Sequence, residues 1–113
     1  MIEIRHYVAA NGRDVFTDWL RQLRDTQAKV AILRRVNRLE LGNFGDHKFL
    51  RDGDFELRVG IGPGYRVYFA KSGGAMILLL GGGDKSTQEG DIDDACINCL
   101  DRQKSKAIQE LKP

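Results

Sequence analysis

The alternation of apolar and polar residues at the start of the chain predicts a β-strand over residues 2–8. Asn11 and Gly12 break this pattern and indicate a turn. After the turn the apolar residues, Trp19 among them, recur with a spacing of three to four positions. This spacing places them on one face of an amphipathic helix over residues 14–23.

A second helix is predicted over residues 26–41, with Thr26 as its N-terminal cap and Gly42 as its stop. Its apolar residues form one stripe at helical spacing: Ala28, Ile32, Val36 and Leu39. The two helices together are expected to form a hairpin that packs on a sheet.

Short apolar runs separated by glycines follow, which predicts an antiparallel meander of about four strands. These strands are expected over residues 47–50, 55–61, 65–70 and 76–80. The middle two alternate cleanly, so one face of each is apolar and the other is polar. The last lacks alternation and is expected to be central and covered on both faces. Glycines 81–83 are expected to end the sheet.

A final helix is predicted after the glycines, because Ser86 and Glu89 have the spacing of a capping box. Its apolar stripe consists of Ile92, Ala95, Cys96 and Cys99. Beyond Asp101 the chain is polar and is expected to fray. The predicted fold class is therefore α+β, with residues 1–113 forming a single domain.

The chain has 113 residues, of which 42% are hydrophobic, enough for one domain with one core and too few for two. The longest apolar run, residues 75–80, is too short to cross a bilayer. The N-terminus shows no basic segment followed by an apolar one, so no signal peptide is recognised. We therefore expect a cytoplasmic protein that makes no membrane contact.

The net charge of +2 is small, but charge is unevenly distributed. Residues 1–41 carry 8 basic and 5 acidic side chains, whereas residues 86–113 carry 4 and 6. This asymmetry permits one positively charged face, although a protein that holds duplex DNA by charge alone is usually more basic. One helix face carries three arginines that could bind a nucleic acid or a partner: Arg34, Arg35 and Arg38. Charged residues on a helix are more often simply exposed to solvent, and this is the preferred interpretation.

One face of the predicted meander gathers polar side chains. If the apolar residues of the two alternating strands face the helices, the opposite, uncovered face displays Glu56, Arg58, Arg66 and Tyr68. Further cations lie near the same face: Lys48, Arg51 and Lys85. Such a surface suits a polyanion such as an RNA backbone. The alternative interpretation is that polar residues face water on any half-buried sheet.

Other candidate sites have ordinary structural explanations. Glycines 81–83 precede a helix, yet neither the dinucleotide-binding nor the Walker pattern is present. His47 could act as a general base, but a single histidine in a turn-rich segment is usually a surface residue. Cys96 and Cys99 could form a redox pair, although an apolar helix face favours buried core positions. Because the histidines lie far from both cysteines in sequence, no metal or other cofactor is expected.

The segment ELRVGIGPGYRVYF, residues 56–69, followed by LLLGGGDKSTQ, residues 78–88, resembles the RelE/ParE toxin superfamily. Within it, the sequence is similar to the branch called addiction module killer proteins. The resemblance covers about residues 1–100, from the first strand through the helical hairpin to the G-G-x-K-S/T-x-Q exit from the sheet. It implies a RelE-like fold with an N-terminal strand, a helical hairpin, a meander of about four strands and a C-terminal helix.

The resemblance also implies an activity. RelE members of the superfamily cut mRNA in the ribosomal A site, and ParE members poison DNA gyrase. By motif position, the residues expected to take part in RNA cleavage are Arg58, Arg66 and Lys85, with Glu56 as the candidate base. The residues expected to bind RNA are Lys48, Arg51 and Tyr68. No tyrosine or histidine near the C-terminus matches the general acid of the family.

This chemistry needs no metal or cofactor, because RNA supplies its own 2′-hydroxyl nucleophile and fixed cations stabilise the charge that develops at phosphorus. The expected partners are the ribosome with its mRNA and a cognate antitoxin, which we expect to be a helix-turn-helix DNA-binding protein. The alternatives are a non-enzymatic, ParE-like gyrase poison on the same fold and a degenerate toxin that acts only as a binding module.

Overall fold

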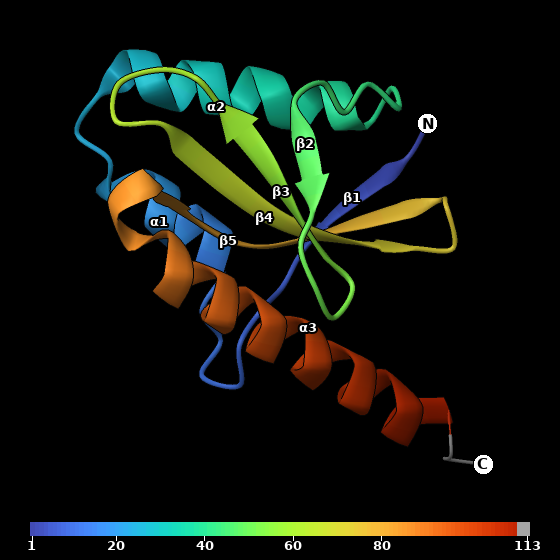
Figure 1. The fold of residues 1–113 in the computed structure, drawn as a ribbon. Coiled ribbons are helices and arrows are strands. Elements are labelled where there is room, and N and C mark those ends of the chain that lie inside the picture. Colours follow the sequence, from blue (N-terminus) through green and yellow to red (C-terminus); the bar gives the residue numbers. More distant parts are fainter. Residues whose placement is uncertain (111–113) are drawn as a thin grey trace.

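The computed structural model describes the backbone of residues 1–110 and the side chains of residues 1–102. Its elements are β1 (Glu3–His6), α1 (Val15–Gln22), α2 (Thr26–Leu39), β2 (His47–Phe49), β3 (Asp54–Val59), β4 (Tyr65–Ser72), β5 (Met76–Asp84) and α3 (Gln88–Glu110) (Figure 1). A short 3₁₀ turn, Lys85–Thr87, precedes α3. The fold is therefore α+β, as the sequence predicted, with a five-stranded mixed sheet and three helices.

The strands form one sheet in the order β1-β5-β4-β3-β2. β2 to β5 are antiparallel neighbours, which confirms the meander, whereas β1 pairs with β5 in parallel. A β-bulge interrupts the β4–β5 ladder, because Tyr68 pairs with Gly81 while Phe69 pairs with Leu79. Leu80 is the extra residue at this point.

The sheet is the middle of three layers (Figure 1). α1 and α2 cover one face, and their buried side chains pack with the inward residues of the strands. The members of this core include Phe16, Ile32, Leu39, Leu57, Val67 and Leu79. α3 covers part of the other face, with a second core made by Tyr7, Tyr68, Ala70, Leu78, Leu80, Ala95 and Cys99. β5 contributes to both cores, so the prediction of a central strand covered on both sides is confirmed.

The second helix begins as predicted but with a different cap. Its N-cap is Asp25, whose carboxylate accepts a hydrogen bond from the Ala28 backbone N–H at 3.2 Å. The predicted cap, Thr26, is the first helical residue instead. The helix ends at Leu39, and Gly42 adopts a left-handed φ of 77° in the turn that follows, which suits a glycine.

The glycines 81–83 do not end the sheet, and that prediction was wrong. They lie inside β5, which continues to Asp84. A Cβ on Gly82 would collide with the ring of Trp19, and one on Gly83 would collide with the carboxylate of Asp91. The missing side chains therefore let α1 and α3 approach this strand from opposite faces, a requirement that propensity alone does not reveal.

The start and the length of the last helix also differ from the prediction. Asp84, not Ser86, provides the capping box, with Thr87 as its partner, and it caps the 3₁₀ turn that leads into α3. α3 then continues to Glu110, so the tail that was expected to fray beyond Asp101 is helical as far as Glu110, and its last three residues lie outside the described part of the chain. Lysine, glutamine and alanine in this segment are good helix formers, and they extend a helix without supplying an apolar stripe that signals it.

Candidate functional site

The candidate site is centred on Glu56, a carboxylate with no solvent exposure. Arg58 Nε donates a hydrogen bond to its Oε2 atom at 3.2 Å. Arg66 Nε lies 3.2 Å from its Oε1 atom, an ion pair without hydrogen-bond geometry. Gln88, the first residue of α3, donates from Nε2 to the same Oε1 atom at 2.6 Å. One buried anion is thus held by two guanidinium groups and one amide.

The sheet register explains why these side chains meet. Arg58 of β3 is opposite Arg66 of β4, and Glu56 is opposite Tyr68. On its other side Glu56 is opposite Lys48 of β2. Because alternate residues of a strand share a face, these five side chains extend from the same face of the sheet. The grouping predicted from the alternation is therefore confirmed for them.

The prediction that this face is uncovered was wrong. α3 contacts β3, β4 and β5, and its first residue reaches Glu56 directly. Only 14% of the Arg66 side chain is exposed, against 37% for Arg58. We expected helices to cover the sheet on the α1–α2 side alone. This was wrong because the apolar stripe of α3 packs on the polar side of the meander. Arg58 is therefore the more accessible of the two arginines beside Glu56.

Tyr68 lies within this covered region, and only 1% of it is exposed. Its hydroxyl has no hydrogen-bond partner among the described residues. Burial raises the pKa of Tyr68 above its usual range, and the negative charges of Glu56 and Asp91 raise it further. The phenol therefore stays protonated, and its proton is not committed to a neighbour.

The remaining predicted cations lie around the cluster rather than in it. Lys48 on β2 and Lys85 in the 3₁₀ turn are exposed. Arg51, in the turn before β3, forms an ion pair with Asp93 of α3, so its position ties that turn to the helix. The structure therefore brings Arg51 to α3 and not to Glu56.

Arg35 was a candidate contact to a nucleic acid, but its side chain connects elements of the fold. Its guanidinium donates to the carbonyl oxygens of Arg58 at 2.5 Å and Phe44 at 3.0 Å. It thereby ties α2 to the end of β3 and to the loop before β2.

Gln88 is the site residue that was not recognised from the sequence. It belongs to the G-G-x-K-S/T-x-Q segment, but no role was assigned to it. Its position directly after the 3₁₀ turn places it where α3 begins over the sheet. A polar residue at the first turn of a helix that follows a glycine run is the signal that could have drawn attention to it.

A second buried carboxylate lies beneath α3. Asp54 of β3 is fully buried, and among the described residues no N–H or O–H group donates to its oxygens. The thiols of Cys96 and Cys99 on α3 oppose the increase in its pKa that burial causes. Burial also raises the pKa of Cys96 to about 12 and that of Cys99 to about 11. Both thiols are core groups with little thiolate character, as their apolar helix face predicted.

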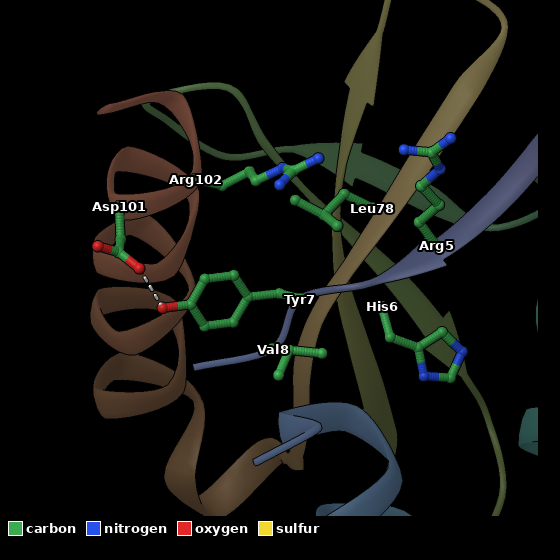
Figure 2. A pocket seen from close by; sticks show the side chains of 7 residues that line it. All are labelled: Arg5, His6, Tyr7, Val8, Leu78, Asp101 and Arg102. Carbon is green, nitrogen blue, oxygen red and sulfur yellow. Dashed lines mark hydrogen bonds between the residues drawn. The ribbon is translucent and has the colours of Figure 1, made fainter. Parts of the chain in front are cut away.

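A separate hollow of about 200 Å³ lies between β1 and α3 (Figure 2). Its lining consists of Arg5, His6, Tyr7, Val8, Leu78, Asp101 and Arg102. Within it, the Tyr7 hydroxyl donates to the Asp101 carboxylate at 2.6 Å. Burial and this bond raise the pKa of Tyr7 to about 12. The hydrogen bond joins the residue that directly follows β1 to α3, and none of the residues predicted for catalysis lines this hollow.

Comparison with known proteins identifies a relative of this chain but assigns no activity to it. The sequence matches no family model. It is 51% identical over 80 residues to an uncharacterized protein of Haemophilus influenzae, a match that covers 71% of this chain and 81% of that protein. The chain belongs to the family of this Haemophilus protein. Because the relative is uncharacterized, membership of its family carries no activity over to the cluster around Glu56.

Two further observations concern the described part of the chain. None of its helices combines the length and the apolar character needed to cross a membrane. In addition, its histidine, cysteine, aspartate and glutamate side chains nowhere gather in a group of three or more that could bind a metal ion.

Proposed function

We propose that this protein is the toxin of a type II toxin–antitoxin system, with the RelE-like fold and the activity of a ribosome-dependent mRNA endoribonuclease. The observation that carries the proposal is the buried Glu56 carboxylate between Arg58 and Arg66 on neighbouring strands. The two arginines are residues that the sequence resemblance to RelE toxins matches to catalytic positions, and Glu56 is the candidate base. The arrangement supports a reaction that needs one base and two cations.

In the proposed reaction, the 2′-hydroxyl oxygen of the RNA attacks the neighbouring phosphorus, and the bond from phosphorus to the 5′-oxygen breaks. Glu56 takes the proton of the 2′-hydroxyl, and Arg58 and Arg66 bind the phosphate oxygens that gain negative charge. The products are a 2′,3′-cyclic phosphate and a 5′-hydroxyl. Tyr68, protonated and without a hydrogen-bond partner among the described residues, is the candidate donor to the leaving 5′-oxygen.

The exposed lysines have a positioning role in this proposal. Lys48 lies beside Glu56 on the edge strand β2, and Lys85 follows the end of β5. Cations on either side of the cluster suit consecutive phosphates of one RNA strand. Arg51 is left out of the RNA-binding set, because its guanidinium is engaged by Asp93.

A specific observation favours a second candidate, a ParE-like gyrase poison that performs no chemistry. Gln88 donates to Glu56 at 2.6 Å, and the carboxylate is fully buried. Access of an RNA to Glu56 therefore requires movement of the first turn of α3. If that turn does not move, the carboxylate and the two arginines form a structural ion-pair network, and toxicity would have to come from binding alone.

Purified protein added to cell-free translation distinguishes the two candidates. A ribonuclease of the proposed kind stops translation and leaves mRNA cut only where ribosomes are translating. A gyrase poison leaves translation intact and blocks DNA supercoiling in a reaction with purified gyrase. The absence of both effects would leave the binding-module alternative.

The proposal also requires an inhibitor that is produced together with the protein in the cell. We expect a neighbouring gene to encode a DNA-binding antitoxin, with a helix-turn-helix, that forms a tight complex with this chain. Co-expression should restore growth to cells that the toxin arrests. Unimpaired growth on expression of the chain alone would contradict the toxin proposal.

A further inference from the structure

A second group of side chains at the β2 edge of the sheet forms a continuous aromatic array. The Phe44 and Phe55 rings each stack on Phe69 with an interplanar angle of 15°, at centroid distances of 6.0 and 5.3 Å. Phe49 joins this array through Phe55, and the two ring centroids are 5.3 Å apart in a T-shaped arrangement. His47 contacts Phe44 at 5.3 Å. The array thus runs from the core at Phe69 to the surface.

The outer end of the array is unusually exposed for aromatic residues. Phe69 is fully buried, whereas 56% of Phe49 is accessible to solvent. His47 is exposed too, and both residues belong to β2, which is an edge strand with a neighbour on one side only among the described strands. An exposed phenylalanine whose ring packs against an aromatic neighbour, as Phe49 does against Phe55, offers a preordered flat surface at little further cost in conformational entropy.

Cations accompany these rings. The Lys71 ammonium lies 4.2 Å from the ring centroid of Phe44 and 4.5 Å from that of Phe55. Lys48 stands between His47 and Phe49 in the chain, and its side chain extends from the opposite face of the sheet, across from Glu56. The edge strand therefore combines aromatic surface with positive charge, and it adjoins the cluster around Glu56.

We propose that His47 and Phe49 form a base-stacking subsite for single-stranded RNA, with Lys48 and Lys71 contacting the flanking phosphates. The proposal rests on the proposed function, because it assigns the RNA strand a course across the β2 edge to Glu56. Aromatic rings interleaved with cations are the usual composition of surfaces that bind single strands without reading a fixed sequence. Lys71 lies over the rings and Lys48 extends from the opposite face of the same edge strand, so both can contact the phosphates of a nucleic acid, which an apolar protein partner lacks.

The test uses the full-length protein and two fluorescent probes, a short single-stranded RNA of mixed sequence and a strand with the same backbone but without bases. The variant Phe49→Leu keeps an apolar side chain and removes the ring, while Phe49→Trp keeps a stacking surface. Leu41→Ala is the matched control, because it removes an exposed apolar side chain that does not belong to the array.

We expect Phe49→Leu to weaken binding of the base-containing RNA by about 5- to 150-fold, which corresponds to the roughly 1–3 kcal/mol that one stacked base contributes. Binding of the abasic strand should be unchanged, and Phe49→Trp and Leu41→Ala should bind like the original protein. Equal affinities of Phe49→Leu and the original protein for the base-containing RNA would overturn the subsite, as would a loss that the abasic strand shows equally.

The outcomes for this subsite and for the proposed function are separable. If the protein cuts ribosome-bound mRNA and Phe49→Leu does so with the same affinity and rate, only the stacking subsite is wrong. If base-dependent binding is lost in Phe49→Leu but the protein cuts no mRNA on ribosomes, the subsite stands and the endoribonuclease proposal fails. A protein that binds neither probe would overturn the subsite directly.

Discussion

Arg66 of β4 and Glu56 of β3 meet inside the protein, with 3.2 Å between Nε and Oε1, although both belong to the polar face of the meander. The carboxylate is fully buried and the arginine nearly so. The pair therefore combines a structural and a proposed catalytic role, and experiments have to separate the two.

A double-mutant cycle between Glu56 and Arg66 should reveal strong coupling. Arg66→Ala leaves a buried anion with one guanidinium fewer and is expected to lower the free energy of unfolding by about 2–4 kcal/mol. Glu56→Gln leaves two cations without their anion and should also destabilise. The loss in free energy of unfolding of the double variant should be smaller than the sum of the two single losses by about 0.5–3 kcal/mol. Denaturant unfolding at neutral pH measures all three losses. Additive losses would show that the two side chains do not interact as the structure indicates.

Arg58→Ala is the cleaner test of activity, because its side chain is 37% exposed and Arg66 remains beside Glu56. We expect cleavage of ribosome-bound mRNA to slow by about 100- to 1000-fold, as for the loss of one group that stabilises transition-state charge. Circular dichroism should show a folded protein. Arg58→Lys should restore activity only in part, since a lysine lacks the planar fork that grips two oxygens. Arg21→Ala, an exposed arginine of α1, serves as control, and equal rates for both alanine variants would contradict the mechanism.

The buried Asp54 should make stability depend on pH. Burial raises its pKa above the ordinary 3.8, so the folded state holds the proton more tightly than the unfolded state. The contribution of Asp54 to the free energy of unfolding is therefore greatest below its pKa in the unfolded state. This contribution is lost as the pH rises through its pKa in the folded state. Asp54→Asn, which cannot ionise, should gain stability relative to the original protein between acidic and neutral pH. Unfolding measurements across this pH range test the assignment, and a pH-independent difference between Asp54→Asn and the original protein would refute it.

The glycines of β5 give a prediction about packing. Gly82→Ala places a methyl group against the Trp19 ring and should cost about 1–3 kcal/mol, the usual effect of overfilling a packed site. Gly90→Ala is the matched control, because nothing lies within 4 Å of its added Cβ and alanine favours the α3 helix by about 1 kcal/mol. Thermal unfolding should therefore shift in opposite directions for the two variants. Equal shifts would mean that α1 does not approach β5 at Gly82.

The local pattern of the sequence determined where most strands and helices lie and which of their residues share a face, although it misplaced the ends of β5 and α3. Leu57, Val59 and Val67 point to the α1–α2 core, and Arg58 and Arg66 point away from it, because alternation along a strand is a property of the backbone itself. The buried stripe of α2 follows from helical spacing for the same reason.

Only the tertiary structure decided what covers the polar face. The apolar stripe of α3, which includes Ala95 and Cys99, specifies that this helix packs on something, but no local rule states on which side of the sheet. Once α3 packs over β4 and β5, Glu56 loses contact with water and Gln88 reaches it. Burial of a carboxylate and the resulting ion pairs depend on contacts between residues far apart in the chain, and the alternation within one strand contains no information about them.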